Sequence, residues 1–191
     1  MGSASSFQRA RLVVAVLSAP GFTGFAPGER FPFEDELAES FGVDCERGPD
    51  LDFGWSDYYD EEMGGSPRRG FLAYSRLVDP ADLASIKART NAVEERWALE
   101  GRRRCNLDPG LLYLSRFSLA TTKDRPHRVP LAEGIFAEVT LIYERGDFRP
   151  LPWTYPDWAS EEYRSFLRSQ REGLKRQLRS LALPVHGASE T

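Results

Sequence analysis

Residues 121–128, with the sequence TTKDRPHR, contain the side chains of this sequence that are best suited to chemistry. Hydroxyl, carboxylate, imidazole and cationic groups occur within this one segment, and the candidates are Thr121, Thr122, Lys123, Asp124, His127 and Arg128. Lysine and arginine hold phosphate or carboxylate groups, and histidine exchanges a proton near neutral pH. We predict an anion site here, with Lys123, His127 and Asp124 as catalytic candidates and Arg128 as a clamp. The alternative is a solvated turn over residues 124–126.

The segment 134–143, GIFAEVTLIY, alternates in polarity and predicts a strand that follows this loop. Its predicted partner is the segment 111–122, LLYLSRFSLATT, taken as one strand, so that the two form a hairpin or meander. A connection centred near residue 128 would place Arg116 opposite Thr140 and Ser118 opposite Glu138. One face is then apolar, and the other gathers Arg116, Ser118, Thr122, Glu138 and Thr140.

This polar face has two interpretations. Its residues are mostly small, which leaves room for a ligand, and Glu138 would then act as a base or a metal ligand. The alternative is a solvated sheet face with an ordinary cross-strand charge pair, which contributes roughly 0.2 to 1 kcal/mol.

Residues 102–110, RRRCNLDPG, form a second polar cluster. Arg104, Asn106 and Asp108 are ligand-binding candidates, because an extended chain would direct at least one arginine towards the polar face. We expect this cluster at the opposite end of the strand 111–122 from Lys123. The alternative is an Asx or proline-containing turn over residues 106–110, in which the polar side chains have a conformational role.

A third cluster, SDYYDEEMGG at residues 56–65, is rich in acids and tyrosines. Tyr58 is a ligand-binding candidate. Asp57 and Glu62 are the candidates for a magnesium site completed by a substrate phosphate, because Mg²⁺ takes oxygen ligands. The alternative is a solvated acidic loop, since the carboxylates follow no fixed ligand spacing.

The C-terminal segment predicts a long helix with a basic stripe, made of Arg164, Arg168, Arg171, Lys175 and Arg179. The stripe is either a solvated face or a wall for anions beside the sheet. Before the helix, the segment 152–158 holds Trp153, Tyr155 and Trp158, which either stack on RNA bases or form a strap over the core.

Composition and motifs exclude several classes of function. A net charge of -4 disfavours a general polyanion binder, because such binding needs many cationic contacts to phosphates. The sequence has no Walker P-loop, dinucleotide-binding glycine motif, zinc-protease motif or hydrolase nucleophile elbow. Cys45 and Cys105 belong to no metal-binding or disulfide pattern, and the apolar run 12–17 is too short to span a membrane. We expect a cytoplasmic protein without a membrane partner.

The elements that must position these residues can be read from periodicity. Residues 12–18 predict a buried strand, residues 33–41 a short helix, and residues 71–78 a further strand, after a short strand near 51–55. The clearest helix starts at the N-cap Asp79 and carries apolar side chains at three- and four-residue spacing up to Gly101.

This order predicts an α+β fold with a ferredoxin-like βαββαβ core. We expect a two-layer sandwich with a C-terminal strand and helix extension, in which both long helices cover one face of the sheet. A single domain would span residues 10–182, between disordered ends at 1–9 and 183–191.

Several segments together resemble the bacterial and archaeal family called domain of unknown function 4416. These are DYYDEEMG at 57–64, the stretch 68–110, LATTKDRPHR at 119–128 and the stretch 134–158. The motifs NLDPG at 106–110 and ATTK at 120–123 are the most specific parts. The resemblance covers roughly residues 10 to 180 and implies no catalytic roles.

From the residues we expect binding of a phosphorylated small molecule or nucleotide on the polar sheet face. They leave open whether the protein also catalyses a hydrolase or transferase reaction on that ligand. The alternative is a non-enzymatic module that binds RNA or a partner protein. Substrate, reaction type, metal dependence and oligomeric state do not follow from the sequence.

Overall fold

The computed structural model describes residues 6–22, 24–26 and 28–182, apart from the side chain of Tyr58. The ends expected to be disordered lie partly or wholly outside these residues, at 1–5 and 183–191. Within the described part, the chain forms one mixed α+β structure with five α-helices and a nine-stranded antiparallel sheet.

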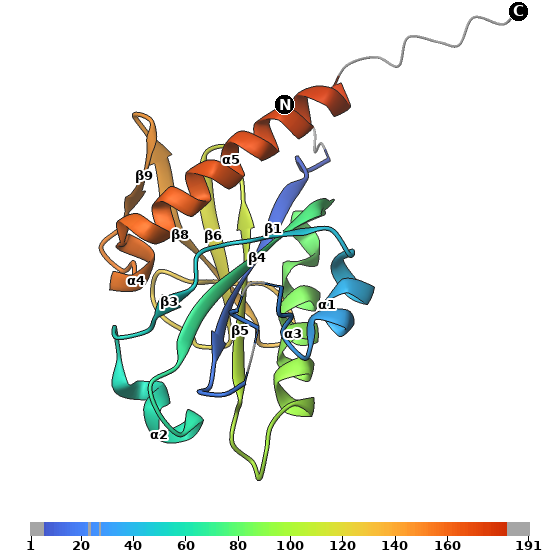
Figure 1. The fold of residues 1–191 in the computed structure, drawn as a ribbon. Helices are drawn as coiled ribbons and strands as arrows, with labels where there is room; N and C mark the ends of the chain where they lie inside the picture. The colour runs from blue at the N-terminus through green and yellow to red at the C-terminus, as the bar shows by residue number, and fades with distance from the viewer. Residues whose placement is uncertain (1–5, 23, 27, 183–191) are drawn as a thin grey trace, which may run out of the picture.

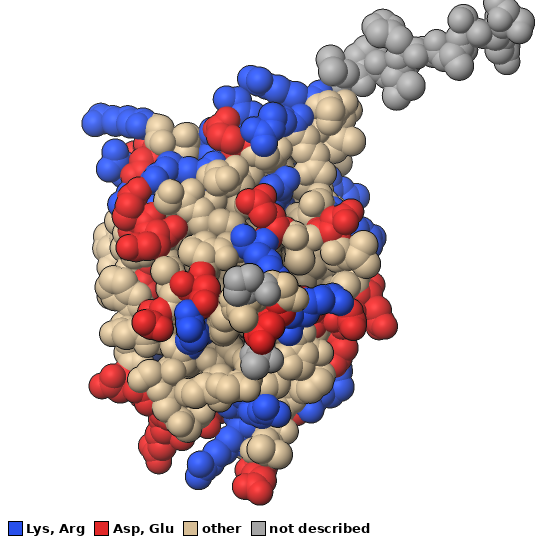
Figure 2. Space-filling view, viewed as in Figure 1, with Lys and Arg blue, Asp and Glu red and all other residues tan. Residues whose placement is uncertain are grey.

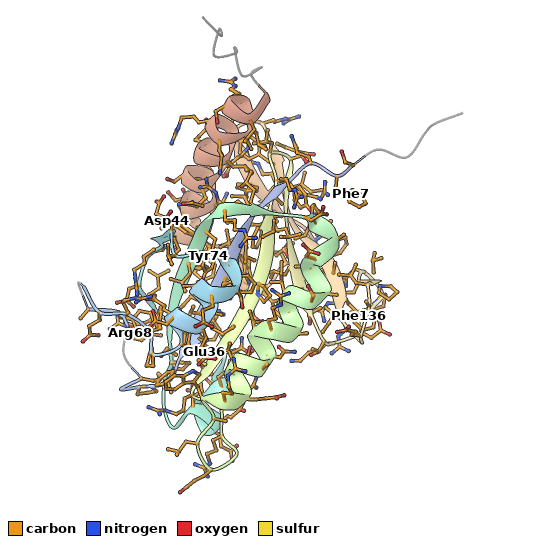
Figure 3. The ribbon with its side chains drawn as sticks, turned by 90° about the vertical axis from the view of Figure 1, so that its right-hand side faces the viewer. Phe7, Glu36, Asp44, Arg68, Tyr74 and Phe136 are labelled. Atoms are coloured by element: carbon orange, nitrogen blue, oxygen red, sulfur yellow. The ribbon has the colours of Figure 1, made fainter. Side chains whose placement is uncertain are left out.

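The sheet has the strand order β2-β4-β1-β5-β6-β8-β7, with β3 paired to β4 and β9 paired to β8. Every pairing is antiparallel. Figure 3 places Arg68 of β4 and Phe136 of β8 on opposite sides of the molecule, in agreement with this order. The strands are β1 Ala10–Ser18, β2 Cys45–Arg47, β3 Leu51–Asp52, β4 Arg68–Val78, β5 Cys105–Leu112, β6 Arg116–Thr121, β7 Val129–Pro130, β8 Phe136–Glu144 and β9 Asp147–Pro150.

Both faces of the sheet are covered, so the predicted two-layer arrangement is wrong. Alternate residues of β1 belong to different cores: Val14 packs in a cluster with α1, while Ala15 packs in a cluster with α5. Figure 1 shows α5 crossing in front of the strands, with α1 and α3 beside one another away from it. The helices are α1 Glu34–Phe41, α2 Asp60–Met63, α3 Leu83–Arg96, α4 Pro156–Ala159 and α5 Glu161–Ala182.

The helix ends follow local sequence signals. Asp79 accepts a hydrogen bond from the backbone N–H of Ala81 at 3.0 Å, as predicted for an N-cap, and a short 3-10 turn then leads into α3. The helix ends at Arg96, earlier than the predicted Gly101. The Ser160 hydroxyl accepts from the N–H of Tyr163 at the start of α5, also as predicted.

The prediction of one strand over residues 111–122 is wrong. The chain turns back between Leu112 and Arg116, so that β5 and β6 form a tight hairpin closed by a hydrogen bond from the N–H of Tyr113 to the carbonyl of Arg116. This turn contains no glycine, proline or asparagine, which are the usual signals. As a result, the NLDPG and ATTK motifs lie at the same end of the hairpin, not at opposite ends.

The alternative of a turn over residues 106–110 is wrong, because these residues belong to strand β5. Residues 105–109 pair with β1, and in the described residues the pairing of β5 with β6 is confined to Gly110–Leu112. Pro109 has no N–H to offer a neighbouring strand. At Gly110 an added Cβ would lie 2.3 Å from the ring of Phe117, so only glycine permits this close pairing. The two strands therefore part beyond Gly110.

The predicted register between the segments 111–122 and 134–143 needs correction. Arg116 lies opposite Ile142 and Ser118 opposite Val139, because a β-bulge at Thr140 shifts the pairing between Phe117 and Ser118. The bulge brings Glu138 opposite Leu119. Glu138 therefore shares a face with Leu119 and Leu141, not with Ser118.

Candidate functional site

A cavity of about 790 Å³ occupies the region where β5 and β6 part. It is lined from one layer by α3 and from the other by α4, so it extends through the gap between the two strands. Its size matches sites for small molecules. The charged lining residues are Arg69, Lys87, Glu94, Glu95, Arg103, Asp108, Lys123, Arg128, Glu138 and Asp157. Five are cationic and five anionic.

Asp108 is the centre of a hydrogen-bonded network along the β5 edge of the cavity. Its Oδ2 accepts from Asn106 Nδ2 at 2.7 Å, and its Oδ1 lies 3.4 Å from Lys87 Nζ. Arg103 NH1 donates to Asn106 Oδ1 at 3.0 Å and extends the network. Side chains two residues apart on a strand share a face, which is why Asn106 and Asp108 meet here.

Arg69 of β4 is a buried cation in the wall of the cavity, with 3% of its surface exposed. Its NH2 lies 3.4 Å from Asp157 Oδ2, and its Nε donates to the Tyr163 hydroxyl at 3.2 Å. Its NH1 is 3.9 Å from Asp108 Oδ2 and has no hydrogen-bond partner in the described residues. Burial raises the pKa of Asp157, and Arg69 opposes that rise.

Lys87 and Glu94 come from the buried side of α3, two helical turns apart. Lys87 Nζ donates to the carbonyl of Leu107 at 2.8 Å, and Glu94 Oε1 accepts from the N–H of Leu107 at 2.7 Å. Lys87 Nζ and Arg103 NH1 each lie 3.8 Å from the Glu94 carboxylate, beyond hydrogen-bond distance. Burial raises the pKa of Glu94 to about 7, against the lowering effect of these cations.

Glu138 of β8 is paired with Arg128, which lies in the loop between β6 and β7. Arg128 Nε donates to Glu138 Oε2 at 2.6 Å, and Arg128 NH1 donates to the carbonyl of Lys123 at 2.7 Å. His127 Nε2 lies 3.3 Å from the same Oε2, and its ring stacks on Trp153 with centroids 5.0 Å apart. Arg128 thus fixes both the loop and the carboxylate.

The predicted magnesium ligands are placed differently from one another. Both oxygens of Glu62 accept from Arg103, at 2.7 and 2.6 Å, and this pairing lowers the pKa of Glu62. Asp57 is exposed. In the described part of the chain, no three His, Cys, Asp or Glu side chains are grouped so as to hold a metal ion.

The cavity brings together seven of the predicted site residues, five of them from the two specific motifs. These are Asn106, Asp108, Thr121, Thr122, Lys123, Arg128 and Glu138. His127 and Asp124 are not among the lining residues, although His127 contacts the lining residue Glu138. The side chain of Tyr58 lies outside the described residues.

Three other predicted residues lie away from the cavity. The guanidinium of Arg116 stacks over the Tyr113 ring at 4.0 Å, and that of Arg104 over the Phe22 ring at 4.2 Å. Thr140 is buried at the bulge, where its carbonyl accepts from the Thr154 hydroxyl. The reversal at residues 113–115 explains why Arg116 lies away from the cavity, because it places that residue at the end of β6 opposite to Thr121.

Sequence reasoning missed Arg69, Lys87, Glu94 and Asp157, and within the arginine run 102–104 it selected Arg104, whereas Arg103 lines the cavity. The helical spacing of α3 could have indicated that Lys87 and Glu94 are buried. Lys87 lies four residues after the buried Leu83, and Glu94 lies four residues after the buried Thr90. Charged residues in such positions are rarely buried without a partner or a function. Arg69 and Asp157 carried no such signal, because their proximity depends on packing of α4 against β4.

The two motifs that converge on this cavity fall within a known protein family. The model of the domain of unknown function DUF4416 matches residues 10–173. The chain belongs to the DUF4416 family. The match confirms the resemblance seen in the sequence motifs of this DUF4416 protein. No curated protein and no solved structure matches it. Of the helices in its described residues, none has the length and hydrophobicity needed to cross a membrane.

Proposed function

We propose that this DUF4416 protein binds a phosphorylated small molecule or nucleotide in the cavity between β5 and β6. The observation that carries the proposal is Arg69 NH1, a buried guanidinium donor that lines the cavity without a hydrogen-bond partner in the described residues. Unpaired buried donors are rare, and a guanidinium suits phosphate oxygens. Lys87 and Lys123 line the same cavity and add positive charge near the bound anion.

The acidic groups of the lining do not prevent anion binding. Each of the buried acids has a cation nearby: Arg69 for Asp157, Arg128 for Glu138, and Lys87 for Glu94. Because burial raises the pKa of Glu94 to about 7, roughly half of its negative charge is absent at neutral pH. The five cationic side chains of the lining therefore at least balance its five acidic ones.

A hydrolase or transferase reaction on the bound ligand would need a group that exchanges protons near neutral pH. Glu94 is the lining residue best suited to this role, because its pKa is about 7 and one of its oxygens is held in place by the N–H of Leu107. Glu138, His127 and Lys123, which the sequence predicts as catalytic residues, would then hold the ligand or support its binding residues.

The proposal is tested by calorimetric titration of the protein with inorganic phosphate and with glycerol 3-phosphate. Replacing Arg69 by glutamine should weaken binding about tenfold or more, since a hydrogen bond to a charged group contributes roughly 1.5 to 3 kcal/mol. The matched control is Arg68→Gln, which removes an exposed cation paired with Asp50. Equal loss in both variants, or no binding by the wild type, refutes the proposal.

The alternative of RNA binding gains no support from α5. Three of the five residues of its basic stripe are engaged: Arg164 and Arg168 are both bound to Asp147, and Arg171 donates to the carbonyl of Leu114. Figure 2 shows acidic groups between the basic ones over this region. Trp153 also donates its indole N–H to Val139, as expected for a strap.

We infer two finer features of the protein. The order β2-β4-β1-β5, with α1 after β1 and α3 after β4, supports a ferredoxin-like βαββαβ core to which β6 through β9 and α5 are added. The two cysteines Cys45 and Cys105 are unbonded, which supports a cytoplasmic location.

A further inference from the structure

One oxygen of the Glu138 carboxylate is left without a hydrogen bond. Oε2 is bound by Arg128, whereas Oε1 is buried and has no partner in the described residues. Glu138 is 3% exposed and lines the cavity. Since a buried acceptor is normally satisfied, this atom indicates a hydrogen-bond donor on the ligand. A phosphate group, which offers mainly acceptors, does not meet this need.

The rest of the cavity is rich in acceptors too. Side-chain oxygens are supplied by all of its layers, from Asn91, Glu94, Asn106, Asp108, Thr121 and Asp157. Most of these oxygens already accept a hydrogen bond within the protein, so a ligand that only accepts hydrogen bonds would leave Glu138 Oε1 unpaired. Hydroxyl groups both donate and accept, and they match such a lining along its length.

The aromatic part of the wall suits the same kind of ligand. Trp158 lines the cavity and is held by ring contacts with Phe117 and Tyr163 at 4.9 and 5.4 Å. Tyr155 lines it near the surface, with 53% of its area exposed. Such rings offer a flat apolar surface to the C–H groups of a sugar, next to polar groups that bind its hydroxyls.

We propose that the ligand of this cavity is a sugar phosphate, held by Arg69 at its phosphate and by Glu138 Oε1 at a hydroxyl. This inference rests on the proposed phosphate binding and adds the chemistry of the remaining part of the molecule. A nucleotide is the less suitable ligand, because its base carries no hydroxyl groups to match the carboxylates and amides of this wall.

The test uses three phosphate monoesters of increasing hydroxyl content: propyl phosphate, glycerol 3-phosphate and sorbitol 6-phosphate. Calorimetric titration of the wild-type protein should give affinities that rise in this order, with at least about a tenfold gain from the first to the last. In Glu138→Gln the gain from propyl phosphate to sorbitol 6-phosphate, compared within the variant itself, should fall about tenfold. Glu144→Gln, an exposed carboxylate at the end of the same strand, is the matched control.

The outcomes separate the two proposals. If propyl phosphate and sorbitol 6-phosphate bind the wild type equally well, the sugar is refuted and phosphate binding stands. If none of the three esters binds, both proposals fail. A gain with hydroxyl content that Glu138→Gln and Glu144→Gln reduce alike refutes the role of Glu138. The wild-type comparison requires no variant, so it decides the ligand class even where Glu138→Gln does not fold.

Discussion

Replacing Glu94 by glutamine should remove a large part of the pH dependence of stability. Burial raises the pKa of this carboxyl from its ordinary value near 4.5 to about 7. The folded state therefore favours the neutral form, and the stabilisation is complete below the unfolded pKa and is lost as the pH rises through about 7. Glutamine resembles the neutral form and keeps an acceptor for the N–H of Leu107.

The size of the effect follows from the two pKa values. Their difference corresponds to about 3 kcal/mol of unfolding free energy, lost by the wild type between roughly pH 4 and pH 8. Glu94→Gln lacks this loss. Its unfolding free energy relative to the wild type should therefore increase by about 3 kcal/mol over the same interval.

Urea unfolding at closely spaced pH values from 4 to 8 measures this difference directly. Glu95→Gln serves as the control, because it removes a carboxylate from the next residue of α3, which is exposed. The reasoning is refuted if the wild type and Glu94→Gln lose stability in parallel. Carbon NMR of the glutamate carboxyl groups provides an independent check, since a resonance titrating near pH 7 should vanish in the variant.

Substitutions at three further positions test other parts of the structure. Lys87→Met should raise the pKa of Glu94 further, because Lys87 lowers it, and the loss of stability measured by urea unfolding should move to higher pH. Gly110→Ala should destabilise the protein by about 1 to 3 kcal/mol in chemical unfolding, because the new Cβ would meet the ring of Phe117; an unchanged midpoint would contradict the close pairing. Asp79→Ala removes the cap on Ala81 and should cost about 1 kcal/mol by the same measurement, whereas Asp79→Asn should retain most of it.

The local elements of this protein could be predicted because their signals are local. The β-branched run became β1, the Asp79 cap became the start of the 3-10 turn that leads into α3, and the Arg145-Gly146 turn led into β9. At that turn both residues have positive φ, at 49° and 85°, which is the conformation of a two-residue hairpin. The family, too, could be recognised, because the motifs that carry it are continuous segments.

The parts that were missed depend on contacts between distant segments. No glycine, proline, asparagine or aspartate marks the reversal at 113–115, so residues 111–122 had the pattern of one strand. The bulge at Thr140 then placed Glu138 on the opposite face from the one predicted. Successive side chains of a strand alternate between its faces, so one extra residue moves those beyond it to the other face of the pairing.

The sequence alone determined which residues carry chemical groups in the two motifs, and it placed those motifs on or beside strands. Only the tertiary structure decided that they share one end of a hairpin and that β5 and β6 part there to leave a cavity. Arg69 and Asp157 are 88 positions apart in the chain. They meet because α4 packs against β4, on the face of the sheet that α5 also covers. Such a pairing has no local pattern, since its energy comes from burial and charge that exist only after the layers have assembled.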